Sequence, residues 1–151
     1  MPTATSGPVV VDVSHLDELL REVVHVIRRR GRGILADYDI TQPQFNALLV
    51  ISNHGPVTMG QLCDHLYLAC STATDLIDRM ERNELIERER DSRDRRVIRL
   101  RMQPRGQQVI DSVMAARRSY LTGVLGNVAP DEQQRFVEAL ERLLDLMQDR
   151  P

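Results

Sequence analysis

Apolar residues recur every three or four positions along most of this chain, and this spacing places them on one face of a helix. The first such stretch covers residues 12–35, and arginines near its end make its outer side basic. Two more follow at 103–125 and 130–147, each with a proline in the first turn, where a missing backbone N–H does no harm. The pattern therefore predicts long amphipathic helices at both ends of the chain.

Three shorter helices are predicted in the middle of the chain, over residues 41–54, 58–66 and 70–83. Thr41 and Thr58 stand where a helix cap is needed, and Gln44 completes a capping box with Thr41. Only residues 67–69 separate the last two of these helices. Two helices joined by a tight turn form a helix-turn-helix unit.

Two short stretches of strand-like alternation come next, LIERER and RRVIRLRM, on either side of the turn-forming cluster DSRD. They predict a β-hairpin, and a hairpin directly after a helix-turn-helix is a wing. The fold class expected is mostly α with a small β-hairpin wing, a winged helix-turn-helix with helices on both sides. Its parts are a flexible tail at 1–11, terminal helices at 12–40 and 104–151, and the winged unit at 41–103, all within one domain at 12–150.

The terminal helices carry more apolar surface than a winged unit of this size can cover. The stripe of the last helix is an example, with Phe136, Leu140 and Leu144 on one side. Burial of this surplus against a second copy of the chain is the simplest solution. We therefore expect a homodimer in which the terminal helices form the interface.

Composition is ordinary for a globular domain, with 42% hydrophobic and 28% charged residues in 151. The net charge of −2 does not suggest a partner of high negative charge. The distribution of charged residues along the chain changes this picture. Residues 79–105 hold ten arginines against six carboxylates, a local net charge of +4. This segment spans the predicted wing, so any nucleic-acid surface is expected there.

The outward side of the predicted helix 70–83 begins with small polar residues, where a helix in the DNA major groove makes its base contacts. At the hairpin tip, three arginines can reach the minor groove or its phosphates. Each feature also has an interpretation without function. The helix could be an ordinary amphipathic helix with a solvent-exposed face, and the tip arginines could be a solvent-exposed run of charges. A helical protein-interaction module without DNA binding is the competing function.

Residues 57–106 resemble the multiple antibiotic resistance regulator (MarR) family of bacterial winged-helix repressors. The segment reads VTMGQLCDHLYLACSTATDLIDRMERNELIERERDSRDRRVIRLRMQPRG, and it is similar to the family's S-T-x-T, L-x-D-R-L-E and D-x-x-D-x-R features, with Met80 in place of the second leucine. The resemblance implies that Asp94 braces Arg96 and that Arg96 enters the minor groove. The candidate DNA-binding residues are Ser71, Thr72, Thr74, Asp75, Arg79, Arg93, Asp94, Arg95 and Arg96.

The resemblance also implies a transcription repressor that binds double-stranded DNA as a homodimer on a pseudo-palindromic operator. A small aromatic or other apolar ligand in a cavity near the dimer interface, or oxidation, would release it. Two departures from the family pattern bear on the recognition helix. Ala69 stands where a capping Ser or Asp is usual, and Glu84 replaces a common glycine, which predicts a less sharply turned helix end.

The two cysteines are given different interpretations. Cys63 lies on the apolar side of its helix and is expected to be an inert buried residue. Cys70 opens the recognition helix, where the helix dipole favours a thiolate, so it is a candidate redox residue; the alternative is a tolerated small residue. No disulfide is assumed between them. Cys63 and His65 point apart on one helix, so no metal site is expected.

Other functional classes receive no support from the sequence. It holds no Gly-rich phosphate loop, no nucleophile elbow and no distinct carboxylate pair, so we expect neither enzyme activity nor a cofactor. No apolar run approaches the ~20 residues needed to span a bilayer, and the first residues do not form a signal peptide. The expectation is a cytoplasmic protein without a membrane partner.

Overall fold

The computed structural model describes residues 9–148. The predicted fold class is confirmed, because this part of the chain is mostly helical with a small antiparallel sheet. Of the predicted tail, residues 1–8 lie outside the described residues, as do 149–151 of the last segment. The elements are α1 (Val13–Asp37), α2 (Gln42–His54), β1 (Val57–Thr58), α3 (Met59–Leu66), α4 (Cys70–Arg82), β2 (Ile86–Arg90), β3 (Ile98–Met102), α5 (Pro104–Leu125) and α6 (Pro130–Gln148).

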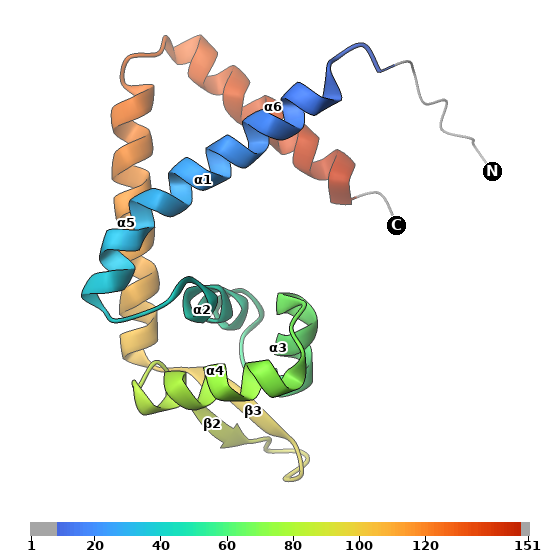
Figure 1. Cartoon of the computed structure of the whole chain (residues 1–151), viewed down its shortest axis with the longest axis vertical. Helices are drawn as coiled ribbons and strands as arrows, with labels where there is room; N and C mark the ends of the chain where they lie inside the picture. The colour runs from blue at the N-terminus through green and yellow to red at the C-terminus, as the bar shows by residue number, and fades with distance from the viewer. Residues whose placement is uncertain (1–8, 149–151) are drawn as a thin grey trace, which may run out of the picture.

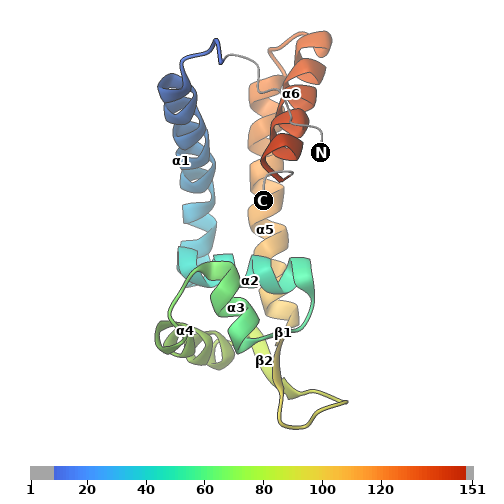
Figure 2. The same cartoon turned by 90° about the vertical axis from the view of Figure 1, so that its right-hand side faces the viewer.

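The elements form a compact winged unit with long helices projecting from it (Figure 1). Helices α2, α3 and α4 and the sheet make up the unit, and α5 packs against both α1 and α2. Helix α6 folds back from the far end of α5. The crossing of α1 and α6 in Figure 1 is only an overlap, because Figure 2 shows them apart.

Local capping fixes where the first helices begin. The Asp12 carboxylate accepts a hydrogen bond from the Ser14 backbone N–H at 3.0 Å. At α2, the Thr41 N–H donates to Gln44 Oε1 at 2.8 Å, and the Gln44 N–H donates to Thr41 Oγ1 at 3.4 Å. The predicted capping box is confirmed, and a second box of the same kind forms at Thr58. Short-range chemistry is therefore enough to set these boundaries.

The core is centred on the winged unit. Large side chains from α2, α4, the sheet and α5 meet there with almost no exposed surface, among them Phe45, Ile77, Leu100 and Val113. Helix α6, in contrast, buries no residue in the described chain. The core thus joins the winged unit to the first half of α5 and the end of α1, whereas the apolar faces of α6 and of the rest of α1 are left uncovered.

The sheet contains a strand that sequence reasoning missed. Residues 57 and 58 form β1, which pairs antiparallel with β3 through Val57 opposite Leu100 and Thr58 opposite Arg99. The strand order is β1-β3-β2. Two residues are too few to show alternation, and Thr58 also caps α3. The strand depends on a partner some forty residues away, so no local signal marks it.

The expectation for Glu84 is wrong. Its backbone adopts the left-handed conformation, with φ 56°, although it is not a glycine. The Leu85 N–H donates to the Met80 carbonyl at 3.0 Å, which closes a sharp turn at the end of α4. This turn is required to aim the buried Leu85 and Ile86 into the core. The turn is therefore as sharp as a glycine would make it, and Glu84 bears the strain.

Glu84→Gly is expected to raise the free energy of unfolding by about 1 kcal/mol. Glycine has no steric penalty at this φ, which stabilises the folded state, and the larger entropy of glycine in the unfolded chain offsets only part of this gain. Urea denaturation at a fixed chain concentration measures the change. Glu84 is exposed, so little packing is lost. An unchanged or lower stability would show that the turn is not strained.

Candidate nucleic-acid interface

The helix-turn-helix is built from α3, residues 67–69 and α4. Tyr67 ends α3 in the left-handed conformation, with φ 53°, and the Leu68 N–H donates to the Cys63 carbonyl at 3.1 Å. Ala69 then takes the N-cap position of α4 without a side-chain hydrogen bond. Helix α4 therefore starts at Cys70, as predicted, with its first backbone N–H groups uncapped by a side chain.

Helix α4 presents a polar face to solvent. Its other side is fully buried through Ala73, Ile77 and Met80. The Thr74 hydroxyl donates to the Cys70 carbonyl at 2.9 Å, so part of its hydrogen-bonding capacity stays within the helix. The sequence-predicted residues of α4 that are exposed are Ser71, Thr72, Thr74, Asp75 and Arg79.

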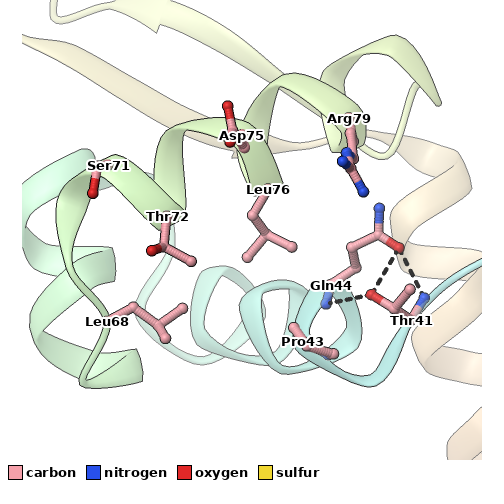
Figure 3. Close-up of a pocket in the computed structure, with 9 residues that line it drawn as sticks. All are labelled: Thr41, Pro43, Gln44, Leu68, Ser71, Thr72, Asp75, Leu76 and Arg79. Carbon is pink, nitrogen blue, oxygen red and sulfur yellow. Dashed lines mark hydrogen bonds between the residues drawn. The ribbon is translucent and has the colours of Figure 1, made fainter.

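A groove of about 710 Å³ runs between this face and the first turn of α2. In Figure 3, Leu76 points from α4 towards α2, and Arg79 lies over Gln44. Thr41 and Pro43 form the opposite wall. Sequence reasoning did not place α2 at this surface, because its approach to α4 is set by the core.

Arg88 ties the wing to α4. From β2, one terminal nitrogen lies 2.6 Å from Asp78 Oδ1, and the other pairs with Glu81. The hydrogen bond to Asp78, more than any other contact, raises the pKa of Arg88 above its ordinary value. Asp78 is thus half-exposed and engaged with the sheet. These contacts set the orientation of the wing relative to α4.

The wing tip is ordered by two aspartates. Asp91 Oδ1 accepts the backbone N–H of Arg93 at 2.8 Å and that of Asp94 at 3.1 Å, and its other oxygen pairs with Arg99. Asp94 Oδ1 in turn accepts the Arg96 N–H at 3.0 Å. Asp94 therefore contacts Arg96 through its backbone and leaves the guanidinium free to point outward.

Three exposed arginines follow from this turn. Arg93, Arg95 and Arg96 are all at the tip, and none has a carboxylate partner within residues 9–148. The strand arginines differ, since Arg99 and Arg101 are paired with Asp91 and Glu89. The tip thus concentrates uncompensated positive charge at the most protruding part of the wing (Figure 2).

Hydrogen bonding from Arg99, helped by the two backbone N–H groups, lowers the pKa of Asp91 from 3.8 to about 2. A depressed pKa means that the tip contacts hold at neutral pH and are lost only as pH falls through about 2. We expect Asp91 to stay ionised at a pH of about 3, and Arg99→Gln to move its midpoint back towards 3.8. Carboxyl NMR titration measures both midpoints. Identical midpoints in the two proteins would refute the role of Arg99.

Comparison with known proteins settles which fold family this is. The MarR family model matches residues 40–98. An uncharacterised HTH-type transcriptional regulator of Bacillus subtilis, YsmB, is 41% identical over 139 residues, which cover 92% of this chain and 94% of YsmB. The chain belongs to the MarR family. A MarR family protein from Bacillus stearothermophilus has a similar structure, with a TM-score of 0.82 and 41% identity over 91% of this chain and 96% of that one.

More distant MarR family structures share the fold alone. The complex of S. aureus MepR with DNA has a TM-score of 0.69 at 20% identity, over 87% of this chain and 98% of MepR. The MarR relatives of this chain are transcriptional regulators, a non-enzymatic class. Within residues 9–148, the helices are all too short or too polar to cross a membrane.

In this MarR family chain the predicted site residues fall into two exposed groups, one on α4 and one at the wing tip. Tyr67 was missed by sequence reasoning; its side chain is 96% exposed at the turn that leads into α4. A lone tyrosine in a turn carries no sequence signal, but a large aromatic side chain fully in solvent beside the recognition helix is a further candidate contact.

One sequence-based interpretation needs revision. Cys63 is buried and Cys70 exposed, as expected, but their Sγ atoms are only 2.7 Å apart. Cys63 therefore has a second, exposed thiol beside it, which its position in the sequence did not reveal. The ring of His54, at the end of α2, stacks on that of His65 in α3, with ring centroids 4.2 Å apart. Among the described residues no three His, Cys, Asp or Glu side chains are grouped to hold a metal ion.

Proposed function

We propose that this MarR family protein is a repressor that binds duplex DNA as a homodimer, with α4 in the major groove and the wing tip at the adjacent minor groove. The observation that carries the proposal is the position of both exposed groups at one end of the molecule, away from α6 (Figures 1 and 2). In S. aureus, MepR has been crystallised with DNA. The same use of the fold is proposed for this chain.

The chemistry of the two groups fits this role. Hydroxyls of Ser71 and Thr72 can bond base edges or phosphates, and Arg79 can bond guanine. The tip arginines offer planar forks that match phosphate and can enter a narrow minor groove. Asp91 and Asp94 act as positioning residues, since they bond backbone N–H groups of the tip. The proposed DNA-binding unit is residues 41–103.

A dimer is supported by apolar surface that the single chain leaves in water. Side chains along α1 and α6 are between a third and two thirds exposed, for example Leu19 at 50% and Leu140 at 61%. Contiguous patches of this kind mark interfaces. A two-fold dimer presents two α4 helices, so we propose a pseudo-palindromic operator with half-sites about 10 bp apart.

Release by a small ligand is proposed at the junction of α1, α2 and α5. The Arg117 side chain lies over the Phe45 ring at 5.5 Å, and its Nε is buried without a hydrogen-bond partner in the described structure. Burial, and secondarily Arg28, lowers the pKa of Arg117. An aromatic or other apolar ligand with a polar edge would find an unsatisfied donor here, while the Phe45 ring beside it is fully buried in the core. Oxidation remains the second proposed signal.

The test is a gel-shift assay with the DNA upstream of the protein's own gene, beside a duplex of equal length and shuffled sequence. Preferential retardation of the upstream duplex supports the proposal. No binding to either duplex favours the alternative, a helical interaction module without DNA binding, and equal retardation of both duplexes contradicts an operator in this DNA. Because the proposed ligand is chromosomal DNA, we propose that the protein acts in the cytoplasm.

A further inference from the structure

Two thiols meet at the junction of the helix-turn-helix. Cys63 comes from the second turn of α3 and Cys70 is the first residue of α4, and their sulfur atoms lie 2.7 Å apart. The contact follows from the local fold. The left-handed Tyr67 and the bond from the Leu68 N–H to the Cys63 carbonyl turn the chain back, so that α4 begins beside α3. The pair is thus a product of the turn itself.

The two thiols differ in access. Cys63 is 4% exposed, whereas Cys70 is open to solvent. Burial, followed by the neighbouring Cys70, raises the pKa of Cys63 to about 11. Cys63 therefore stays protonated and shielded from reagents in solution. Only a group already at Cys70 is close enough to react with it.

We propose that Cys63 and Cys70 form a redox pair, in which a hydroperoxide oxidises Cys70 and Cys63 then closes an intrasubunit disulfide between α3 and α4. The effect on DNA rests on the proposed function; the chemistry of the pair does not. A disulfide bond is about 2.05 Å long and needs a defined torsion, so closing it displaces the start of α4 relative to α3. Ser71 and Thr72 follow Cys70 directly, and their placement on DNA changes with it.

The chemistry proceeds in two balanced steps. The Cys70 thiolate attacks the terminal oxygen of the hydroperoxide; the O–O bond breaks, and an alcohol (or water, from hydrogen peroxide) leaves after taking up a proton. Cys70 is now a sulfenic acid. The Cys63 sulfur attacks the Cys70 sulfur, the S–O bond breaks, and hydroxide leaves as water with the Cys63 proton. One hydroperoxide is reduced and two thiols are oxidised, and a dithiol reverses the change.

The first test reads the chemistry without DNA. Wild type, Cys63→Ala and Cys70→Ser are treated with hydrogen peroxide and with cumene hydroperoxide, then analysed by intact mass and free-thiol count. Wild type is expected to lose about 2 Da and both thiols, without an intersubunit crosslink, and to recover with dithiothreitol. Cys63→Ala is expected to accumulate a dimedone-reactive sulfenic acid, and Cys70→Ser to stay unmodified.

The second test measures DNA binding of the same samples. Oxidised wild type is expected to bind the upstream duplex about tenfold more weakly than reduced wild type, as when one base contact per half-site is disturbed. Dithiothreitol restores the affinity, and Cys70→Ser is insensitive to peroxide. If oxidised wild type kept both thiols, or formed a disulfide between subunits, the proposed Cys63–Cys70 pair would be wrong. If the intrasubunit disulfide formed but the affinity for DNA stayed unchanged, the proposed effect on DNA binding would be wrong.

These two tests also separate this proposal from the proposed function. Reduced protein that fails to prefer the upstream duplex contradicts the DNA-binding function, while the mass analysis still decides whether the pair forms. Cys70 is exposed, so Cys70→Ser is expected to fold even if a change at the buried Cys63 lowers stability.

Discussion

Arg96→Ala is expected to weaken operator binding by about 1–3 kcal/mol, or about 5- to 150-fold in Kd. Arg96 is exposed at the wing tip, and its only described hydrogen bond there is from its backbone N–H to Asp94. Removal of the side chain therefore takes away a cation that we propose faces the DNA, but no contact of the fold. Thermal stability and dimerisation are expected to be unchanged.

The matched control is Arg118→Ala, which removes the same charge from an exposed position on α5, away from the wing. Both variants are titrated against the upstream duplex at one salt concentration. Equal affinities of Arg96→Ala and wild type would show that the wing tip does not contact DNA. Equal losses in both variants would indicate a general effect of net charge.

Leu140→Glu is expected to produce a monomer at micromolar chain concentration. Leu140 is 61% exposed in the single chain and lies in the apolar stripe of α6 with Phe136, Val137 and Leu144, also exposed. A carboxylate at the centre of this stripe would have to be buried without a partner in a dimer, which costs several kcal/mol. Operator affinity is expected to fall by at least about 100-fold, because each half-site is then bound separately.

Arg142→Glu is the matched control, since it introduces the same side chain on the opposite side of α6. Sedimentation velocity measures the assembly of both variants, and the gel shift measures binding. A dimeric Leu140→Glu protein would exclude the α6 stripe as the interface. A monomer that keeps wild-type affinity would contradict a dimeric mode of binding.

Much of the fold was predictable because its signals are local. The starts of α1, α2 and α3 depend on Asp12, Thr41 and Thr58, each of which bonds backbone or side-chain groups two or three residues away. The helical stripes and the alternation of β2 and β3 are likewise short-range patterns. Residue spacing and capping residues were therefore enough to predict the helices, their order and the wing, but not strand β1.

The features that sequence reasoning missed depend on contacts between distant or differently oriented segments. Strand β1 exists only because β3 is beside it, and Thr41 reaches the α4 groove only because α2 is packed into the core. The Cys63–Cys70 contact depends on the angle between α3 and α4, which spacing along one helix cannot supply. Glu84 shows that tertiary packing can impose a left-handed turn on a residue that disfavours it.

The candidate DNA-contacting residues remain predictions, although the structure leaves them exposed. The exposed face of α4 and the tip arginines have the chemistry that the site requires. Contact with bases or phosphates forms in the complex with DNA, and binding measurements on single variants assign it to individual residues. Tyr67 belongs in the same experiments, because it is equally exposed beside α4.

Sequence-specific binding of duplex DNA is the central claim, and fluorescence anisotropy tests it most directly. Reduced protein is titrated into labelled upstream duplex and into a shuffled duplex, each at several salt concentrations. The expected result is a preference of at least about 1,000-fold for the upstream duplex, with affinity for both falling steeply as salt rises. Equal affinity for the two duplexes, or no binding at low salt, would contradict the account.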